Sequence, residues 1–211
     1  MASLVLVPWA ETKWSAAGRI VSRTPVSLTE AGRNRSAEWA DQLVALRPRA
    51  VYSSEVPPAA ETALILATRY GIRHVLKEAL AEVDAGLWAG LTYDEIKRRD
   101  VKIFKRWFED PSSVCPPEGE ELLAAAGRLE ASLANVVRKH AEKTTAVVLG
   151  PFAFSVARCV IESVELTEAR SMMRDDPLAY GIVDHREMSL EGPTPVTRDE
   201  HPCDTTERSV D

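Results

Sequence analysis

Residues 145–161, TAVVLGPFAFSVARCVI, decide the fold class of this chain. The first five form a continuous apolar run, which is typical of a strand buried on both faces of a sheet. Gly150 and Pro151 end that run, and a proline at such a junction favours the first turn of a helix. The residues that follow, up to Ile161, are apolar enough for a buried helix. The stretch therefore predicts a strand that leads directly into a helix.

The same alternation extends along the rest of the chain. Apolar runs at residues 4–7 and 50–53 predict two more buried strands, and residues 180–183, with 188–190 beside them, are a candidate last strand. Helical patterns occupy residues 27–46, 57–70, 92–99 and 120–143; the first and third open with capping-box sequences and the second stops before Gly71. This order predicts an α/β fold, a three-layer α/β/α sandwich with a mostly parallel central sheet.

The chain divides into two regions by composition. Residues 1–191 carry all the predicted strands and helices, so we expect them to form one domain. Residues 192–211 hold three prolines, two arginines and five acidic residues, with almost no apolar side chains. Such a segment cannot bury enough surface to offset the entropy of ordering it. We therefore predict a flexible acidic tail after residue 191.

Composition also limits the partners. The chain has 211 residues and a net charge of −6, which argues against a nucleic-acid surface. Its apolar runs are far shorter than a membrane span, and the opening run at residues 4–7 is too short for the apolar region of a secretory signal. The three cysteines are widely spaced without a CxxC pair, which offers no zinc site and fits a reducing compartment. We expect a cytoplasmic protein without metal or cofactor, and a homo-oligomer is one open option.

The ends of the predicted strands indicate where a ligand would bind. In open α/β sheets the ligand crevice lies beyond the carboxyl ends of the strands. Here those ends fall at residues 7–9, 52–54 and 149–151. Together with the loop at residues 82–92, these junctions are the expected walls of a site.

Several short motifs, in order and spacing, resemble one known family. The matching segments are Glu11-Thr12, Leu28-Thr29-Glu30-Ala31-Gly32-Arg33, Tyr52-Ser53-Ser54, Ala59-Ala60-Glu61-Thr62-Ala63, residues 82–92 and Pro116-Pro117-Glu118-Gly119-Glu120. Together they resemble the histidine phosphatase superfamily, in its phosphoglycerate mutase-like branch, from about Leu4 to about Val183. The resemblance implies a phosphoglycerate mutase-like fold and phosphoryl transfer through a phosphohistidine.

The catalytic residues that the resemblance implies are replaced in this chain. Pro8-Trp9-Ala10 stands where the family has Arg-His-Gly, and Pro58 stands where it has a second arginine. Gly150, or Pro151 if the match slips by one, takes the place of the second histidine. None of the four histidines present falls at a matching junction. This chain is thus identified as a degenerate member of the family.

These replacements remove the family's chemistry. An indole offers no nitrogen lone pair, so Trp9 cannot attack phosphorus, and prolines carry no charge. Phosphoryl transfer depends mostly on electrostatic stabilisation, and removing one such donor costs roughly 10²–10³ in rate. Glu82 remains where the family has its general acid. Arg19 and Arg23 are the candidate contacts for an anion.

We therefore expect a pseudoenzyme that acts by binding a protein partner or a small ligand. One alternative is a weak or altered phosphatase that uses Glu82 as its general acid. Another is a self-associating structural protein. Mutation of Glu82 tests the phosphatase alternative, because any activity that depends on this acid would be lost. The state of association in solution tests the structural alternative.

Overall fold

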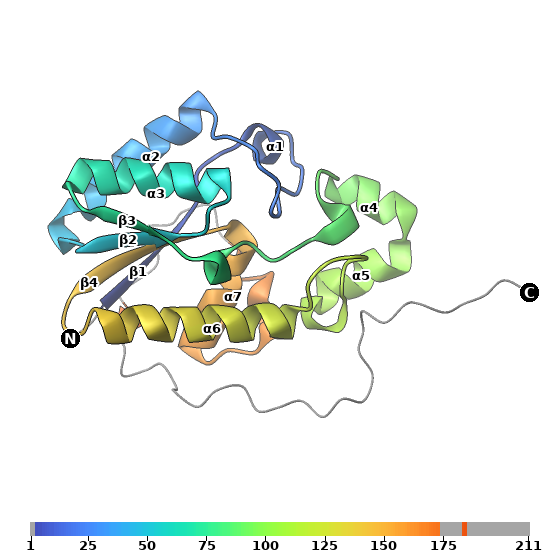
Figure 1. The fold of residues 1–211 in the computed structure, drawn as a ribbon. Coiled ribbons are helices and arrows are strands. Elements are labelled where there is room, and N and C mark those ends of the chain that lie inside the picture. The colour runs from blue at the N-terminus through green and yellow to red at the C-terminus, as the bar shows by residue number, and fades with distance from the viewer. Residues whose placement is uncertain (1–2, 174–182, 185–211) are drawn as a thin grey trace, which may run out of the picture.

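A five-stranded sheet forms the centre of the molecule (Figure 1). The computed structural model describes residues 3–173 and 183–184; residues 180–182 and 188–190 of the predicted last strand and the predicted tail lie outside this part. The strands are β1 (Ser3–Pro8), β2 (Ala50–Ser53), β3 (Arg73–Leu76), β4 (Thr144–Leu149) and β5 (Val183–Asp184), in the order β3-β2-β4-β1-β5. All neighbours run parallel except β5, which pairs antiparallel with β1. The predicted mostly parallel sheet is confirmed.

Helices cover both faces of this sheet, as the sandwich prediction requires (Figure 1). The helices are α1 (Lys13–Ala16), α2 (Glu30–Leu43), α3 (Pro57–Tyr70), α4 (Tyr93–Arg99), α5 (Val101–Glu109), α6 (Leu122–Lys139) and α7 (Pro151–Glu162). Alternate residues of β1 divide between the two faces: Leu4 and Leu6 pack with α6 and α7, while Val5 and Val7 pack with α2 and α3. Because helices cover both faces of the sheet, the side chains that point to either face are apolar, and β1 is an unbroken apolar run.

Several element boundaries differ from the sequence predictions. Helix α2 has its N-cap at Thr29, whose hydroxyl accepts from the Gly32 N–H, so the capping box predicted from Ser27 is wrong. Helix α6 starts at Leu122 and not at Glu120, because the backbone N–H of Glu120 donates to the Asp84 carbonyl in a loop contact. By contrast, the capping box at Thr92 is confirmed.

A third apolar cluster lies beyond the end of the sheet, around α4 and α5. It is built on Trp88, Ile96, Trp107 and Val114. Helix α5 was not predicted; Asp100 caps it by accepting from two backbone N–H groups. This cluster covers the carboxyl ends of the strands, so it creates an enclosed space there. None of the described helices is both long and apolar enough to cross a membrane.

Candidate functional site

A cavity of about 300 Å³ lies between the carboxyl ends of β1 and β4 and the α4–α5 cluster. Trp9 follows β1, Phe152 follows β4, and Tyr93 and Trp107 come from α4 and α5. The volume is at the lower end of the range for small-molecule sites. The predicted location of the site at the strand ends thus coincides with a cavity, although part of its roof comes from α5, which no motif had indicated.

Aromatic side chains form much of the lining. They are Trp9, Trp88, Tyr93, Trp107 and Phe152. Trp88 and Trp107 lie edge to face, with ring centroids 5.8 Å apart and planes at 89°. Trp107 also packs against Tyr93 at 5.6 Å and against Phe152 at 6.1 Å. Trp107 therefore connects Trp88, Tyr93 and Phe152 into one aromatic wall.

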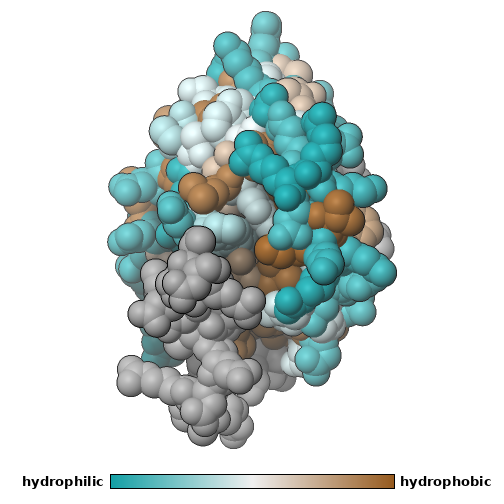
Figure 2. Space-filling view, turned by 90° about the vertical axis from the view of Figure 1, so that its right-hand side faces the viewer, coloured by the Kyte–Doolittle hydropathy of each residue, from teal (hydrophilic) through white to brown (hydrophobic). Residues whose placement is uncertain are grey.

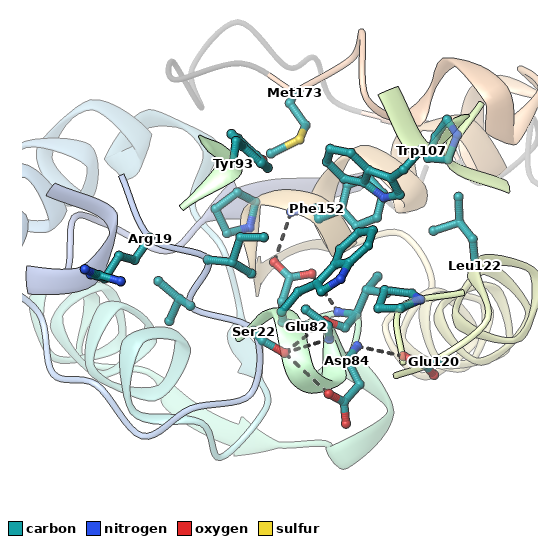
Figure 3. Close-up of a pocket in the computed structure, with 18 of the residues that line it drawn as sticks. Arg19, Ser22, Glu82, Asp84, Tyr93, Trp107, Glu120, Leu122, Phe152 and Met173 are labelled. Carbon is teal, nitrogen blue, oxygen red and sulfur yellow. Dashed lines mark hydrogen bonds between the residues drawn. The ribbon is translucent and has the colours of Figure 1, made fainter. Parts of the chain in front are cut away.

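Glu82 lies at the centre of the cavity residues and is 4% exposed (Figure 3). Its carboxylate accepts hydrogen bonds from the backbone N–H groups of Val83 (2.6 Å), Phe152 (3.0 Å) and Ala153 (2.6 Å). The last two are the free donors of the first turn of α7, which has no side-chain cap of its own. The carboxyl oxygens of Glu82 therefore cap the N-terminus of α7.

Burial outweighs these donors in setting the protonation of Glu82. Desolvation raises the pKa of Glu82 to about 7, against the lowering effect of the three N–H groups and of Arg128. A carboxyl group near neutrality can hold or release a proton at physiological pH. The site thus contains one titratable group with a perturbed pKa at its centre.

Gly150 faces this carboxylate directly. A Cβ built on Gly150 would lie 2.1 Å from Oε2 of Glu82 and 2.7 Å from the Trp9 ring. The backbone of Gly150 has φ −71°, which any residue can adopt, so the constraint is steric and not conformational. The space that a histidine at position 150 would need is filled by Glu82 and Trp9.

The Pro8-Trp9-Ala10 segment is built into the core. Trp9 is 4% exposed, and its backbone N–H donates to the Leu149 carbonyl at 2.8 Å. The Ala10 N–H donates to the Thr62 hydroxyl of α3. Among the described residues the Trp9 indole N–H has no hydrogen-bond partner. Trp9 therefore fills space at the end of β1 and lines the cavity with carbon.

The two other proline positions of the predicted site, Pro58 and Pro151, lie in the first turns of helices. Pro58 lies in the first turn of α3 and is buried outside the cavity lining. Pro151 opens α7 and does line the cavity. A proline in the first turn has no N–H to offer an anion, which leaves both helix ends with fewer donors.

The predicted anion contacts are already paired with carboxylates. Arg19 lines the cavity, but its guanidinium donates to the Gly90 carbonyl (2.6 Å) and to Glu95 (3.1 Å) and is directed away from Glu82 (Figure 3). Arg23 is not among the lining residues; it donates to the Glu82 carbonyl and forms an ion pair with Glu120 at 2.8 Å. The structure therefore does not bring these two arginines together as an anion site.

A network around Arg128 fixes the backbone that carries Glu82. Arg128 forms an ion pair with Glu120 at 2.6 Å and donates to the carbonyls of Ala79, Ala81 and Glu82. Although burial favours the neutral form of Glu120, hydrogen bonds and charge from Arg128, with the charge of Arg23, hold its pKa below the usual value. Glu120 is thus an ionised structural anchor.

The described histidines lie apart from the cavity lining. His140 bonds to the Tyr52 hydroxyl at 2.9 Å, and His74 bonds to the Ser53 hydroxyl at 2.8 Å. Burial lowers the pKa of both imidazoles. In the part of the chain that the structure describes, no group of three His, Cys, Asp or Glu side chains is placed to hold a metal ion.

Sequence reasoning found part of the aromatic lining. Trp9 and Trp88 lie in segments that were predicted to border the site, and Phe152 directly follows the predicted junction at residues 149–151. Trp107 carried no signal in the sequence, because it lies on a helix far from any motif and reaches the site only through packing. The role of Arg128 was missed for the same reason.

Comparison with known proteins supports the family resemblance. The model of the histidine phosphatase superfamily (branch 1) matches residues 4–191. Phosphoserine phosphatase 1 of Hydrogenobacter thermophilus is 27% identical over 183 residues, covering 87% of this chain and 86% of that protein. The metal-independent phosphoserine phosphatase of Arabidopsis thaliana is 31% identical over 148 residues, covering 69% and 62%.

Solved structures agree with the fold. YhfR of Bacillus stearothermophilus superposes with a TM-score of 0.76 at 27% identity, over 81% of this chain and 85% of that one. The family match spans most of the chain, including both strand ends that border the cavity. On these grounds the chain belongs to the histidine phosphatase superfamily, branch 1.

Proposed function

We propose that this chain has lost phosphohistidine catalysis and uses its cavity to bind a ligand other than a phosphate ester. The observation that carries the proposal is the Glu82 carboxylate against Gly150, where the resemblance implies a histidine. A phosphate group there would meet a buried acid and not an imidazole. It would also find the α7 donors already taken.

Charge supports the same proposal. The charged side chains that line the cavity are Arg19, Glu82, Asp84 and Glu120, and Arg19 is paired with Glu95. A phosphomonoester carries about two negative charges near neutral pH. Its transfer requires cations or strong donors at the oxygens that gain charge. Glu120 is paired with Arg128 and Arg23, and Asp84 with Arg23, so the charge in the lining that opposes such a substrate comes mainly from Glu82.

One observation favours the alternative enzyme. A buried carboxyl group with a pKa near neutrality has the protonation behaviour of a general acid. In that alternative Glu82 protonates the leaving group while water attacks phosphorus. The related proteins named as phosphoserine phosphatases make phosphoserine a substrate to test.

The test is phosphate release from phosphoserine, 3-phosphoglycerate and p-nitrophenyl phosphate, measured across pH 5 to 9. The wild-type chain, Glu82→Gln and the matched control Glu61→Gln are compared, with the Hydrogenobacter protein as positive control. Glu61 lies on α3, where it pairs with Arg33, and does not line the cavity. We expect no phosphate release above the blank from the wild-type chain or from either variant. Release that Glu82→Gln abolishes and Glu61→Gln preserves would establish the enzyme alternative instead.

A further inference from the structure

We propose that the cavity binds a small organic cation, an ammonium or guanidinium group carried on a compact apolar or aromatic body. The inference rests on the proposed function, because it names the ligand class for the same cavity. It follows from three observations: the aromatic wall, a cation of the chain already held beside that wall, and the Glu82 carboxylate.

The aromatic wall presents the surfaces that attract cations. The face of an aromatic ring is electron-rich, and tryptophan binds cations best of the three aromatic residues. Trp88 and Trp107 stand nearly perpendicular, and Tyr93 and Phe152 flank Trp107. Rings at such angles present both faces and edges to one enclosed space. A quaternary ammonium gains most from this arrangement, because it is weakly hydrated and needs no hydrogen bonds.

The molecule itself supplies a precedent at the edge of the same cluster. The guanidinium of Arg170 lies 3.1 Å from the ring centroid of Phe108 and 5.9 Å from that of Trp107. Arg170 comes from the segment after α7 and stacks on α5 from a distant part of the sequence. The aromatic side chains of α5 therefore already hold one organic cation, chiefly on Phe108, which lies beside the aromatic wall and outside the cavity lining.

The carboxylate of Glu82 completes the case, because Asp84 and Glu120 are already paired with arginines. In the view of Figure 3, Tyr93, Phe152 and Trp107 lie on one side of Glu82, and Asp84 and Glu120 lie on the other. A cation between the rings and Glu82 would be neutralised by that carboxylate. A neutral apolar ligand would leave Glu82 against hydrocarbon, and an anion would add repulsion. Charge selects the cation among ligands of equal size.

The size and position of the cavity restrict the body of the ligand. A volume of about 300 Å³ holds a single ring with a short side chain. Figure 2 looks onto the end of the molecule that carries α4 and α5, and shows apolar surface among hydrophilic residues. Tyr93 is 38% exposed, so it is the most exposed member of the aromatic wall. Tyr93 is therefore the wall residue that can be changed with the least damage to the core.

The experiment compares four probes that share a benzyl group and differ in charge. They are benzyltrimethylammonium, benzyl alcohol, phenylacetate and benzyl phosphate, each titrated calorimetrically at pH 8 into the full chain. We expect the ammonium to bind at least about tenfold more tightly than the alcohol, and the two anions not to bind. Glu82→Gln should reduce the preference for the ammonium at least about threefold, while Glu61→Gln leaves it unchanged. Tyr93→Leu, at the more exposed ring, should weaken the ammonium more than the alcohol.

The outcomes separate this inference from the proposed function. Equal or tighter binding of the alcohol or of phenylacetate, or no binding of any probe, would overturn the cation inference and leave the loss of catalysis standing. Hydrolysis of benzyl phosphate would overturn the proposed function, whichever probe binds. A preference for the ammonium that persists in both Glu82→Gln and Tyr93→Leu would place the cation outside this cavity and reject the inference.

Discussion

The carboxylate of Glu82 lies where a side chain at Gly150 would have to be, with only 2.1 Å between Oε2 and the position of a Cβ. One residue follows β4 and the other belongs to the loop after β3, so their contact exists only in the folded chain. Glu82 thereby caps the N-terminus of α7. The carboxyl group at position 82 and the absence of a side chain at position 150 are thus coupled physically.

This coupling predicts that a side chain at position 150 is costly only while Glu82 is present. Gly150→Ala should lower the free energy of unfolding by about 1–3 kcal/mol, because a methyl group overpacks the contact with Glu82 and Trp9. In a Glu82→Ala background, Gly150→Ala should lower the free energy of unfolding clearly less. Urea unfolding of the two single variants and the double variant measures the coupling. Strict additivity would show that the contact is not what restricts position 150.

The raised pKa of Glu82 predicts a specific pH dependence of stability. Its pKa rises from 4.5 to about 7 on folding, so the folded state holds the proton more tightly than the unfolded state. The stabilising effect is therefore complete below pH 4.5 and is lost as pH rises to 7 and beyond. The loss amounts to at most about 3 kcal/mol.

Glu82→Gln removes this titration and provides the measurement. Relative to wild type, the variant should gain stability between pH 5 and pH 8, while Glu61→Gln shows no such trend. Urea unfolding at four pH values in that range gives the difference directly. A constant difference between Glu82→Gln and wild type would mean that Glu82 titrates alike in both states.

Arg128 is predicted to be a structural requirement of the site. Its guanidinium forms an ion pair with Glu120 and donates hydrogen bonds to three backbone carbonyls, and its side chain is 20% exposed. Arg128→Met should cost about 2–4 kcal/mol, since it leaves Glu120 and those carbonyls with fewer partners. Arg128→Lys should cost less but not zero, because an ammonium cannot reproduce the planar fork.

The control for this prediction is an arginine in an exposed pair. Arg35 pairs with Glu38 on the surface of α2, so Arg35→Met should change stability by less than about 1 kcal/mol. Thermal or urea unfolding of the three variants gives the comparison. Equal effects at positions 35 and 128 would contradict the role assigned to Arg128.

Inorganic phosphate is predicted not to stabilise the protein. A ligand that binds the folded state raises the unfolding temperature by mass action. Because Glu82 already occupies the donors of α7 and Arg19 and Arg23 are paired, about 10 mM phosphate should act no differently from chloride at the same ionic strength. Differential scanning fluorimetry provides the measurement. A rise of several degrees specific to phosphate would reveal an anion site in the chain.

Local sequence was enough to predict the layers of the fold. Contiguous residues specify the apolar strands β1, β2 and β4. The same holds for helices α3 and α7, which open with proline. These elements could therefore be predicted without knowledge of the tertiary structure. Strand β3 was missed because Arg73 and His74 break the apolar pattern at the edge of the sheet. The cytoplasmic location, the state of association and the acidic tail stay predictions.

The sequence by itself determined the family and its fold, because both are written in contiguous motifs at the ends of predicted strands; the loss of the family's catalysis stays a prediction. Only the tertiary structure decided what the remaining residues do. It placed Glu82 on the donors of α7, paired Arg19 and Arg23 with carboxylates, and brought Trp107 from a distant helix to the cavity. These contacts join residues far apart in the chain, and packing sets them where no local pattern can.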